Sequence, residues 1–188
     1  MIDRLLPAEA TEPGTASEVG GELTVHWLYG RRSQEMFGFA RRLGLGDEDA
    51  SDAVQETMLR LWRELESGAE IADPGAWAFR VLYRLAVDSH RLKGRVRRVV
   101  ERLGFEAGAA DRGREGSDPA TGAEVDAVWQ AVDRLPERQR AVLYLHFRAD
   151  MSYEQIGLTL AISPSAARGH ASTGLATLRR RLHDEVER

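Results

Sequence analysis

The segment between Ser152 and Pro164 contains two helix starts separated by one short turn. Ser152 is followed three residues later by Gln155, which is the spacing of a capping box that begins a helix. Ala161 and Ile162 form a tight turn, and Ser163 with Pro164 then supplies an N-cap and a proline at the first helical position. This pattern predicts a helix-turn-helix, so it constrains the fold more than any other part of the chain.

Residues 156–183 contain no Asp or Glu, although the whole chain has 30 acidic and 26 basic residues. The same window has three consecutive arginines close to its end, at residues 179–181, so it favours contact with a polyanion. In a helix-turn-helix the second helix lies in the major groove, and its first residues meet base edges. A solvated, arginine-rich face would give a similar pattern, but the combined signals favour DNA binding. The residues expected at base edges are Ser165, Arg168, Gly169 and His170.

Length and composition indicate a folded protein of two small domains. A chain of 188 residues with 43% hydrophobic and 30% charged residues fits two units of about 70 to 90 residues each. The sequence has no signal peptide and no apolar run near the length of a membrane span, so we expect a cytoplasmic protein without membrane insertion. The polar residues 1–22 are expected to form a disordered N-terminal extension.

Cysteine is absent, which excludes disulfides, thiol redox sensing and cysteine-based zinc sites. The five histidines show no pair at the spacing of metal ligands. We therefore expect neither a metal site nor a cofactor.

Charge is distributed unevenly along the chain. Residues 80–98 hold seven basic residues and one acid, which makes a second basic zone. Residues 103–124 hold five acids, two arginines and several glycines, without apolar periodicity. The sequence therefore predicts a flexible acidic linker at 103–123 between domains at 23–102 and 124–188, and it predicts that the two halves move independently.

Helical periodicity dominates, and no alternating strand pattern of useful length appears, so an all-α fold is expected. Helices are expected from Leu23 to Leu43, from Asp47 and after Asp73, followed by four helices in the second domain. The residues expected on buried faces are Trp27, Phe37, Ala40, Leu43, Ala50, Val54, Leu61, Leu65, Trp77, Val81, Leu82, Leu85, Val125, Val128, Trp129, Val132, Ala141, Val142, Leu145 and Phe147.

Four sequence blocks, at 49–62, 76–88, 135–140 and 151–157, resemble bacterial sigma factors of the extracytoplasmic-function group of the sigma-70 family. The resemblance implies that the first domain binds core RNA polymerase and minus-ten promoter DNA, and that the second binds the minus-thirty-five element. It also implies an anti-sigma factor as a partner, and no enzymatic chemistry.

The resemblance assigns residues to three surfaces. The polymerase-binding residues would be Asp52, Gln55, Glu56 and Arg60. The minus-ten residues would be Trp77, Arg80, Arg84, Arg91, Lys93 and Arg95, although Trp77 could instead belong to the core. The minus-thirty-five residues would be Ser163, Ser165, Arg168, His170, Thr173 and Arg179.

The chain departs from the family pattern at two places. Tyr83 and Arg84 stand where relatives usually have Arg and Asn, so the family's Asn contact does not transfer to this chain. Arg168-Gly169-His170 stands where relatives often have Lys-Ser-Arg, which removes positive charge from the recognition helix.

The leading hypothesis is a transcription initiation factor. The alternative is a sigma mimic that sequesters an anti-sigma factor without reading DNA. An ordinary repressor or activator would leave residues 49–62 unexplained, and no nucleophile and base pattern suggests an enzyme.

Overall fold

The computed structural model describes the backbone of residues 20–102 and 123–186, and the side chains of residues 20–93 and 128–181. Within these ranges all regular secondary structure is α-helical, which confirms the expected fold class. The helices are α1 Gly21–Arg42, α2 Asp47–Glu66, α3 Pro74–Arg102, α4 Ala123–Asp133, α5 Glu137–Phe147, α6 Tyr153–Leu160 and α7 Pro164–Val186. Residues 1–19 of the predicted extension and 103–122 of the predicted linker lie outside the described residues, whereas Gly21 and Glu22 already belong to α1 and Ala123 begins α4.

Local signals explain where the first helices begin and end. Gly44 has a φ of 96°, a left-handed conformation that suits glycine, and it turns the chain between α1 and α2. The first turn of α2 carries Asp47, Glu48 and Asp49, whose charges suit the positive end of the helix dipole. At the start of α3, the Asp73 Oδ1 accepts a hydrogen bond from the Ala76 amide at 2.8 Å, as an N-cap does.

The first half of the chain is a three-helix unit in which α1, α2 and α3 contact one another. Its core includes Leu28, Phe39, Leu61, Phe79 and Leu82, each at most 1% exposed. Several residues expected in this core, namely Trp27, Phe37, Leu65, Trp77 and Leu85, are only partly buried against it. The periodicity therefore identified the buried side of each helix correctly, but not always its innermost residues.

The second half packs α5, α6 and α7 together, with α4 against α5 and α7. Two expected core residues are instead exposed: Val128 at 42% and Phe147 at 58%. Among the described side chains of α4, the buried ones are Ala131 and Val132, about one helical turn nearer its C-terminal end than Val128. Phe147 is the last residue of α5, and its ring packs edge-on against His146.

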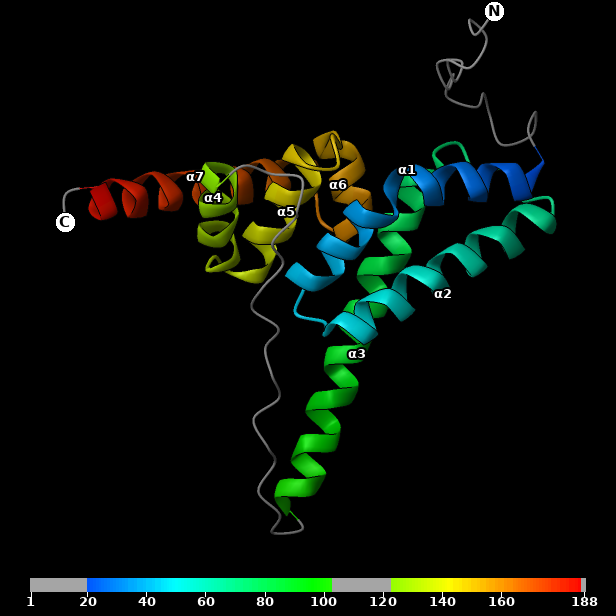
Figure 1. Cartoon of the computed structure of the whole chain (residues 1–188), viewed down its shortest axis with the longest axis horizontal. Helices are drawn as coiled ribbons and strands as arrows, with labels where there is room; N and C mark the ends of the chain where they lie inside the picture. The colour runs from blue at the N-terminus through cyan, green and yellow to red at the C-terminus, as the bar shows by residue number, and fades with distance from the viewer. Residues whose placement is uncertain (1–19, 103–122, 187–188) are drawn as a thin grey trace, which may run out of the picture.

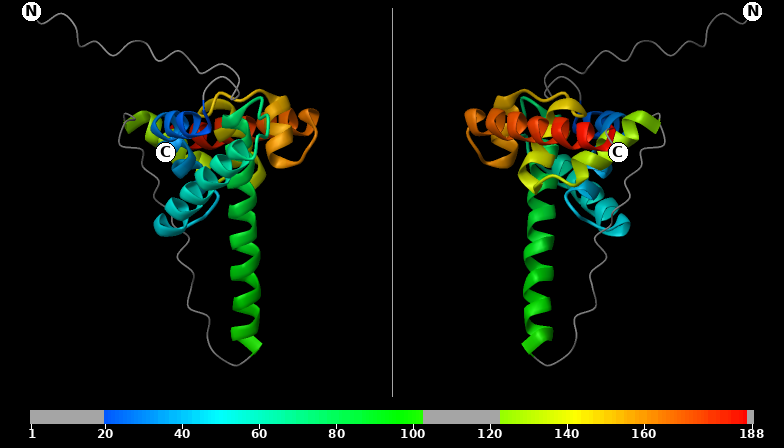
Figure 2. Two further views of the ribbon diagram at one scale, coloured as in Figure 1. Left: turned by 90° about the vertical axis from the view of Figure 1, so that its right-hand side faces the viewer. Right: turned by 90° about the vertical axis from the view of Figure 1, so that its left-hand side faces the viewer.

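The two halves are in direct contact in this structure, and their independent movement stays a prediction. Helix α3 packs against α6, and α1 packs against α5. Figures 1 and 2 show α4 to α7 gathered beside α1 and the start of α3, while the rest of α3 extends away from the other helices. Buried residues of both halves form one continuous hydrophobic cluster. No helix in the described part of the chain is both long enough and apolar enough to cross a membrane.

Candidate nucleic-acid interface

The turn between α6 and α7 has the geometry that the sequence predicted. The Ser152 Oγ accepts from the Gln155 amide at 3.2 Å, and the Gln155 Oε1 accepts from the Ser152 amide at 2.8 Å, so the capping box is confirmed. Ala161 adopts a left-handed conformation with a φ of 54°, which ends α6 sharply. A Cβ on Gly157 would lie 2.8 Å from the Ile162 carbonyl oxygen, so the tight turn requires glycine there.

Helix α7 begins at Pro164, with Ser163 as its cap. The Ser163 Oγ accepts a hydrogen bond from the Ala166 amide at 3.1 Å. The hydroxyl of Ser163 therefore stabilises the helix start, whereas the sequence assigned this residue to the DNA contact. Ser165 is exposed in the first turn of α7.

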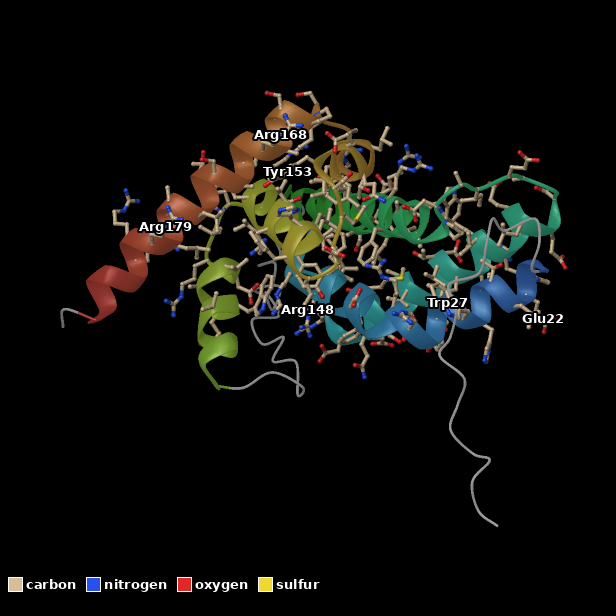
Figure 3. The ribbon with its side chains drawn as sticks, turned by 90° about the horizontal axis from the view of Figure 1, so that it is seen from above. Glu22, Trp27, Arg148, Tyr153, Arg168 and Arg179 are labelled. Carbon is tan, nitrogen blue, oxygen red and sulfur yellow. The ribbon has the colours of Figure 1, made fainter. Side chains whose placement is uncertain are left out.

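Arg168 is exposed near the start of α7 and is held by two residues of α6. Its Nη2 lies 3.1 Å from the Glu154 Oε1, and its guanidinium lies 5.6 Å from the centre of the Tyr153 ring. Tyr153 in turn stacks on His146, with ring centres 4.5 Å apart. Figure 3 shows Tyr153 and Arg168 side by side where α6 meets α7.

Glu154 is a contact of Arg168 that the sequence did not reveal, because it lies just before the acid-free window. Hydrogen bonds from its own backbone amide and from Ser152, together with the charge of Arg168, hold the pKa of Glu154 below its ordinary value. Glu154 and Arg168 are 14 residues apart, so only the helix-turn-helix geometry brings them together.

The other residues expected at minus-thirty-five DNA are spread along α7. Thr173 is exposed, and its hydroxyl donates to the Gly169 carbonyl at 2.9 Å, while His170 is half-buried. Arg179 is exposed and lies farther along the helix than Arg168 (Figure 3). Arg181, by contrast, is half-buried and donates to the Arg134 carbonyl at 3.3 Å. Of the three consecutive arginines, Arg181 therefore contacts the protein itself, whereas Arg179 is exposed.

The residues expected at minus-ten DNA lie along α3. Trp77 is partly buried against the hydrophobic core, Arg80 is half-buried and Arg84 is exposed. Arg91 lies 3.5 Å from the Asp88 carboxylate, and Lys93 lies 2.5 Å from the Asp49 carboxylate. The side chain of Arg95 lies outside the described residues.

Tyr83, one of the departures from the family pattern, is partly buried where α3 faces the second half. Burial raises the pKa of its hydroxyl, and the charges of Arg138 and Glu137 on α5 act on it in opposite directions. This side chain is therefore placed close to the contact between the halves.

The residues expected to bind polymerase lie on the outward side of α2. Asp52 and Gln55 are exposed, and the Glu56 Oε1 lies 2.7 Å from the Arg60 Nε. Helix α2 packs on α1 and α3, and the main contacts between the halves come from α1 and α3. The outward side of α2 is therefore open to a partner. The described side chains contain no cluster of three or more potential metal ligands among His, Cys, Asp and Glu.

Two family models match the two helical halves in order. The model described as Sigma-70 region 2 matches residues 28–96, and the model described as Sigma-70, region 4 matches residues 126–178. The second match contains the whole of the helix-turn-helix turn.

Individual proteins show the same similarity. The chain is 28% identical over 158 residues to the ECF RNA polymerase sigma factor SigE of Mycolicibacterium smegmatis, covering 81% of this chain and 59% of that protein. It is 28% identical over 164 residues to the ECF RNA polymerase sigma factor SigL of Mycobacterium tuberculosis, covering 84% of this chain and 88% of that protein. The sigma factor RpoE of Bartonella quintana, solved with the anti-sigma factor NepR, has a TM-score of 0.63 at 19% identity, over 86% of this chain and 97% of RpoE.

Proposed function

Because this chain belongs to the extracytoplasmic-function sigma factors of the sigma-70 family, we propose that it is a transcription initiation factor that directs core RNA polymerase to specific promoters. The observation that carries this proposal is the ordered match of region 2 and region 4 to the two helical halves. As a member of this family the chain acts by binding and is not an enzyme.

The first half would supply the contacts to polymerase and to minus-ten DNA. The outward side of α2, with Asp52 and Glu56, would bind core polymerase. On α3, exposed cations such as Arg84 and Arg91 would contact phosphates, which position a protein on DNA without reading its sequence. The exposed positions of these side chains support this assignment.

The second half would read the minus-thirty-five element through the start of α7. Arg168 lies in the second turn of that helix, and an arginine there can bond the O6 and N7 of guanine. Arg179 lies farther along the helix and would contact phosphates.

The partners of this protein would be core RNA polymerase, promoter DNA and an anti-sigma factor, and its place of action would be the cytoplasm. The similarity to a sigma factor solved with the anti-sigma factor NepR supports the anti-sigma partner. The alternative is a mimic that binds only the anti-sigma factor. Such a mimic would not increase transcription by core polymerase.

Run-off transcription tests this proposal. The full chain is added to bacterial core RNA polymerase on a template library with randomised minus-ten and minus-thirty-five positions. We expect transcripts from a subset of templates that core polymerase alone does not transcribe. Transcription no higher than that of core polymerase alone would overturn the proposal and favour the mimic.

A further inference from the structure

We propose that Tyr153 of α6 is a positioning residue for Arg168, and that His146 of α5 holds Tyr153 in place. The base preference of α7 then depends on two stacked rings supplied by the two helices before it, and we call these two rings the aromatic support. This inference deepens the proposed function and rests on it, because it concerns how the minus-thirty-five element is read.

Arg168 needs an outside support if it is to read a base. Its side chain is 57% exposed, and an arginine has more rotamer freedom than most residues. A long cationic side chain at this place can bond a guanine edge or swing to a phosphate, and only the first contact reads sequence. Base discrimination by Arg168 therefore depends on neighbouring groups that favour one direction of its guanidinium.

Tyr153 restrains Arg168 without occupying any of its hydrogen-bond donors. The guanidinium carbon lies over the Tyr153 ring, 5.6 Å from the ring centre, and a cation is attracted to the electrons of an aromatic face. Glu154, in contrast, occupies a donor, because its carboxylate lies 3.1 Å from Nη2. A guanidinium has five N–H donors, and a bidentate contact with guanine uses only two of them. The contact with Tyr153 is therefore compatible with a bound base.

The ring of Tyr153 is itself fixed. Tyr153 is the first residue of α6, directly after the capping box of Ser152 and Gln155, so the start of its helix is well defined. Its side chain is partly buried against the hydrophobic core. Its ring stacks on that of His146, with ring centres 4.5 Å apart and planes 23° apart. A tyrosine has only two side-chain torsions, so holding it in one place costs little conformational entropy.

His146 is anchored to the loop that leads into α6. It is half-buried near the end of α5, and its Nδ1 donates to the Met151 carbonyl at 3.0 Å. Because a carbonyl only accepts, this hydrogen bond places the proton on Nδ1 and orients the imidazole. Met151 is 4% exposed, and its amide donates to the Leu145 carbonyl at 2.9 Å. The loop is thus bound back to α5, and the imidazole is held where it meets Tyr153.

A role in packing alone would explain the stack of His146 on Tyr153, but not the contact with Arg168. An exposed arginine adds little to a core, and exposed charge contacts contribute little to stability. The two roles also predict different losses. Without positioning, the chain loses preference at the base that Arg168 reads. Without packing, it loses affinity for every duplex, whether or not Arg168 is present.

The test measures base discrimination by the full chain with DNA alone. The wild-type chain selects duplexes from a library with randomised minus-thirty-five positions, and a second selection with Arg168→Ala identifies the base whose preference is lost. The discrimination ratio is the Kd for the duplex with that base changed, divided by the Kd for the selected duplex. Fluorescence anisotropy gives both constants.

Tyr153→Leu removes the ring and keeps an apolar side chain. We expect it to lower the discrimination ratio by roughly two- to tenfold, which corresponds to the cost of ordering one long side chain on binding. Tyr153→Phe keeps the ring and should restore the wild-type ratio. Tyr29→Leu, the same change at a 49% exposed tyrosine of α1, is the matched control and should leave the ratio unchanged. A wild-type ratio in Tyr153→Leu would overturn the proposal.

A double-mutant cycle separates positioning from packing. A positioning residue acts only through Arg168, so Tyr153→Leu should raise the Kd for the selected duplex in the wild-type chain. The same change in the Arg168→Ala chain should alter that Kd by less than about twofold. Equal increases in the two backgrounds would show that Tyr153 serves packing and does not position Arg168.

His146→Asn tests the other half of the aromatic support. The Asn amide can still donate to the Met151 carbonyl, but the stacked ring is lost. We expect a lower discrimination ratio, with a smaller change than for Tyr153→Leu. This variant decides the matter if Tyr153→Leu shows no cooperative urea unfolding, and a wild-type ratio would then count against the support.

These outcomes are distinct from failure of the proposed function. A chain that discriminates bases through Tyr153 but supports no run-off transcription would lose the proposed function and keep the aromatic support. A chain that supports transcription but keeps its wild-type ratio in Tyr153→Leu would lose only the support. Absence of any base preference in the wild-type chain would also overturn the support, since there would be no reading to position.

Discussion

The guanidinium of Arg168 lies 3.1 Å from the carboxylate of Glu154, across the turn that joins α6 to α7. Tyr153 supports the same guanidinium from one side. Both groups are exposed, so the ion pair adds little stability by itself. Its effect is on orientation, because it restricts the directions in which the Arg168 side chain can point.

Arg168→Ala should reduce base discrimination at the minus-thirty-five element more than it reduces overall affinity. A bidentate arginine to guanine contact contributes roughly 1–3 kcal/mol of discrimination. Arg179→Ala is the matched control, and it should weaken binding to all sequences alike, reducing the salt slope by about one unit. Selection on randomised promoter DNA measures both. Unchanged preferred bases with Arg168→Ala would make this residue a phosphate contact.

Glu154→Gln should loosen Arg168 without removing it. We expect weaker base discrimination together with equal or higher affinity for non-specific DNA, since a negative charge near the phosphates is lost. The same selection measures discrimination, and titration with a scrambled duplex measures non-specific affinity. A variant that retains the full wild-type preference would show that Glu154 does not position Arg168.

Reversing charge at Asp52 and Glu56 together should weaken binding to core polymerase while leaving the fold intact. Asp52 is exposed and Glu56 contacts only Arg60 among the described ion pairs, so a surface pair of small energetic value is lost. Glu22→Lys, at an exposed acid on α1, is the control (Figure 3). Affinity measured by fluorescence anisotropy should fall only for the double variant. Wild-type affinity in that variant would remove α2 as the binding surface.

The two glycines of α7 should respond oppositely to alanine. A Cβ at Gly169 would meet nothing within 4 Å, whereas at Gly174 it would lie 3.0 Å from Leu143 Cδ1. Gly169→Ala should therefore raise the free energy of unfolding by about 0.5–1 kcal/mol, as expected for an exposed helical site. Gly174→Ala should raise the free energy of unfolding by less, or should lower it, because α5 packs closely against this position. Urea unfolding measures both, and equal gains would contradict the packing difference.

Asp133 should make stability depend on pH. Burial raises the pKa of its carboxyl above the ordinary value of 3.8, although Arg42 and Arg140 partly oppose this. Because the folded chain binds the proton more tightly, stability should increase as pH falls through the raised pKa, and the gain should be complete below 3.8. Asp133→Asn should remove this pH-dependent part of the free energy of unfolding, measured by urea unfolding between about pH 7 and about pH 4. Parallel pH profiles for wild type and variant would contradict it.

The sequence by itself determined the helical class and the helix-turn-helix. These features depend on contacts between residues a few positions apart, such as the capping pair Ser152 and Gln155. The spacing of residue types along the sequence is therefore enough to predict them. The sequence blocks also identified the family that the region 2 and region 4 matches then confirmed. The roles of individual residues on α2, α3 and α7 remain predictions.

Only the tertiary structure decided which side chains from distant parts of the sequence contact one another. Tyr144 and Glu35 are 109 residues apart, and Gln155 and Asp73 are 82 apart, so no local spacing connects them. The linker has no apolar pattern, which suggested that the two halves would not pack together. The contact between the halves is made instead by their helices. The physical reason is that burial of Phe39, Arg42 and Tyr144 depends on how two separate helical surfaces fit together, which a pattern along one chain does not contain.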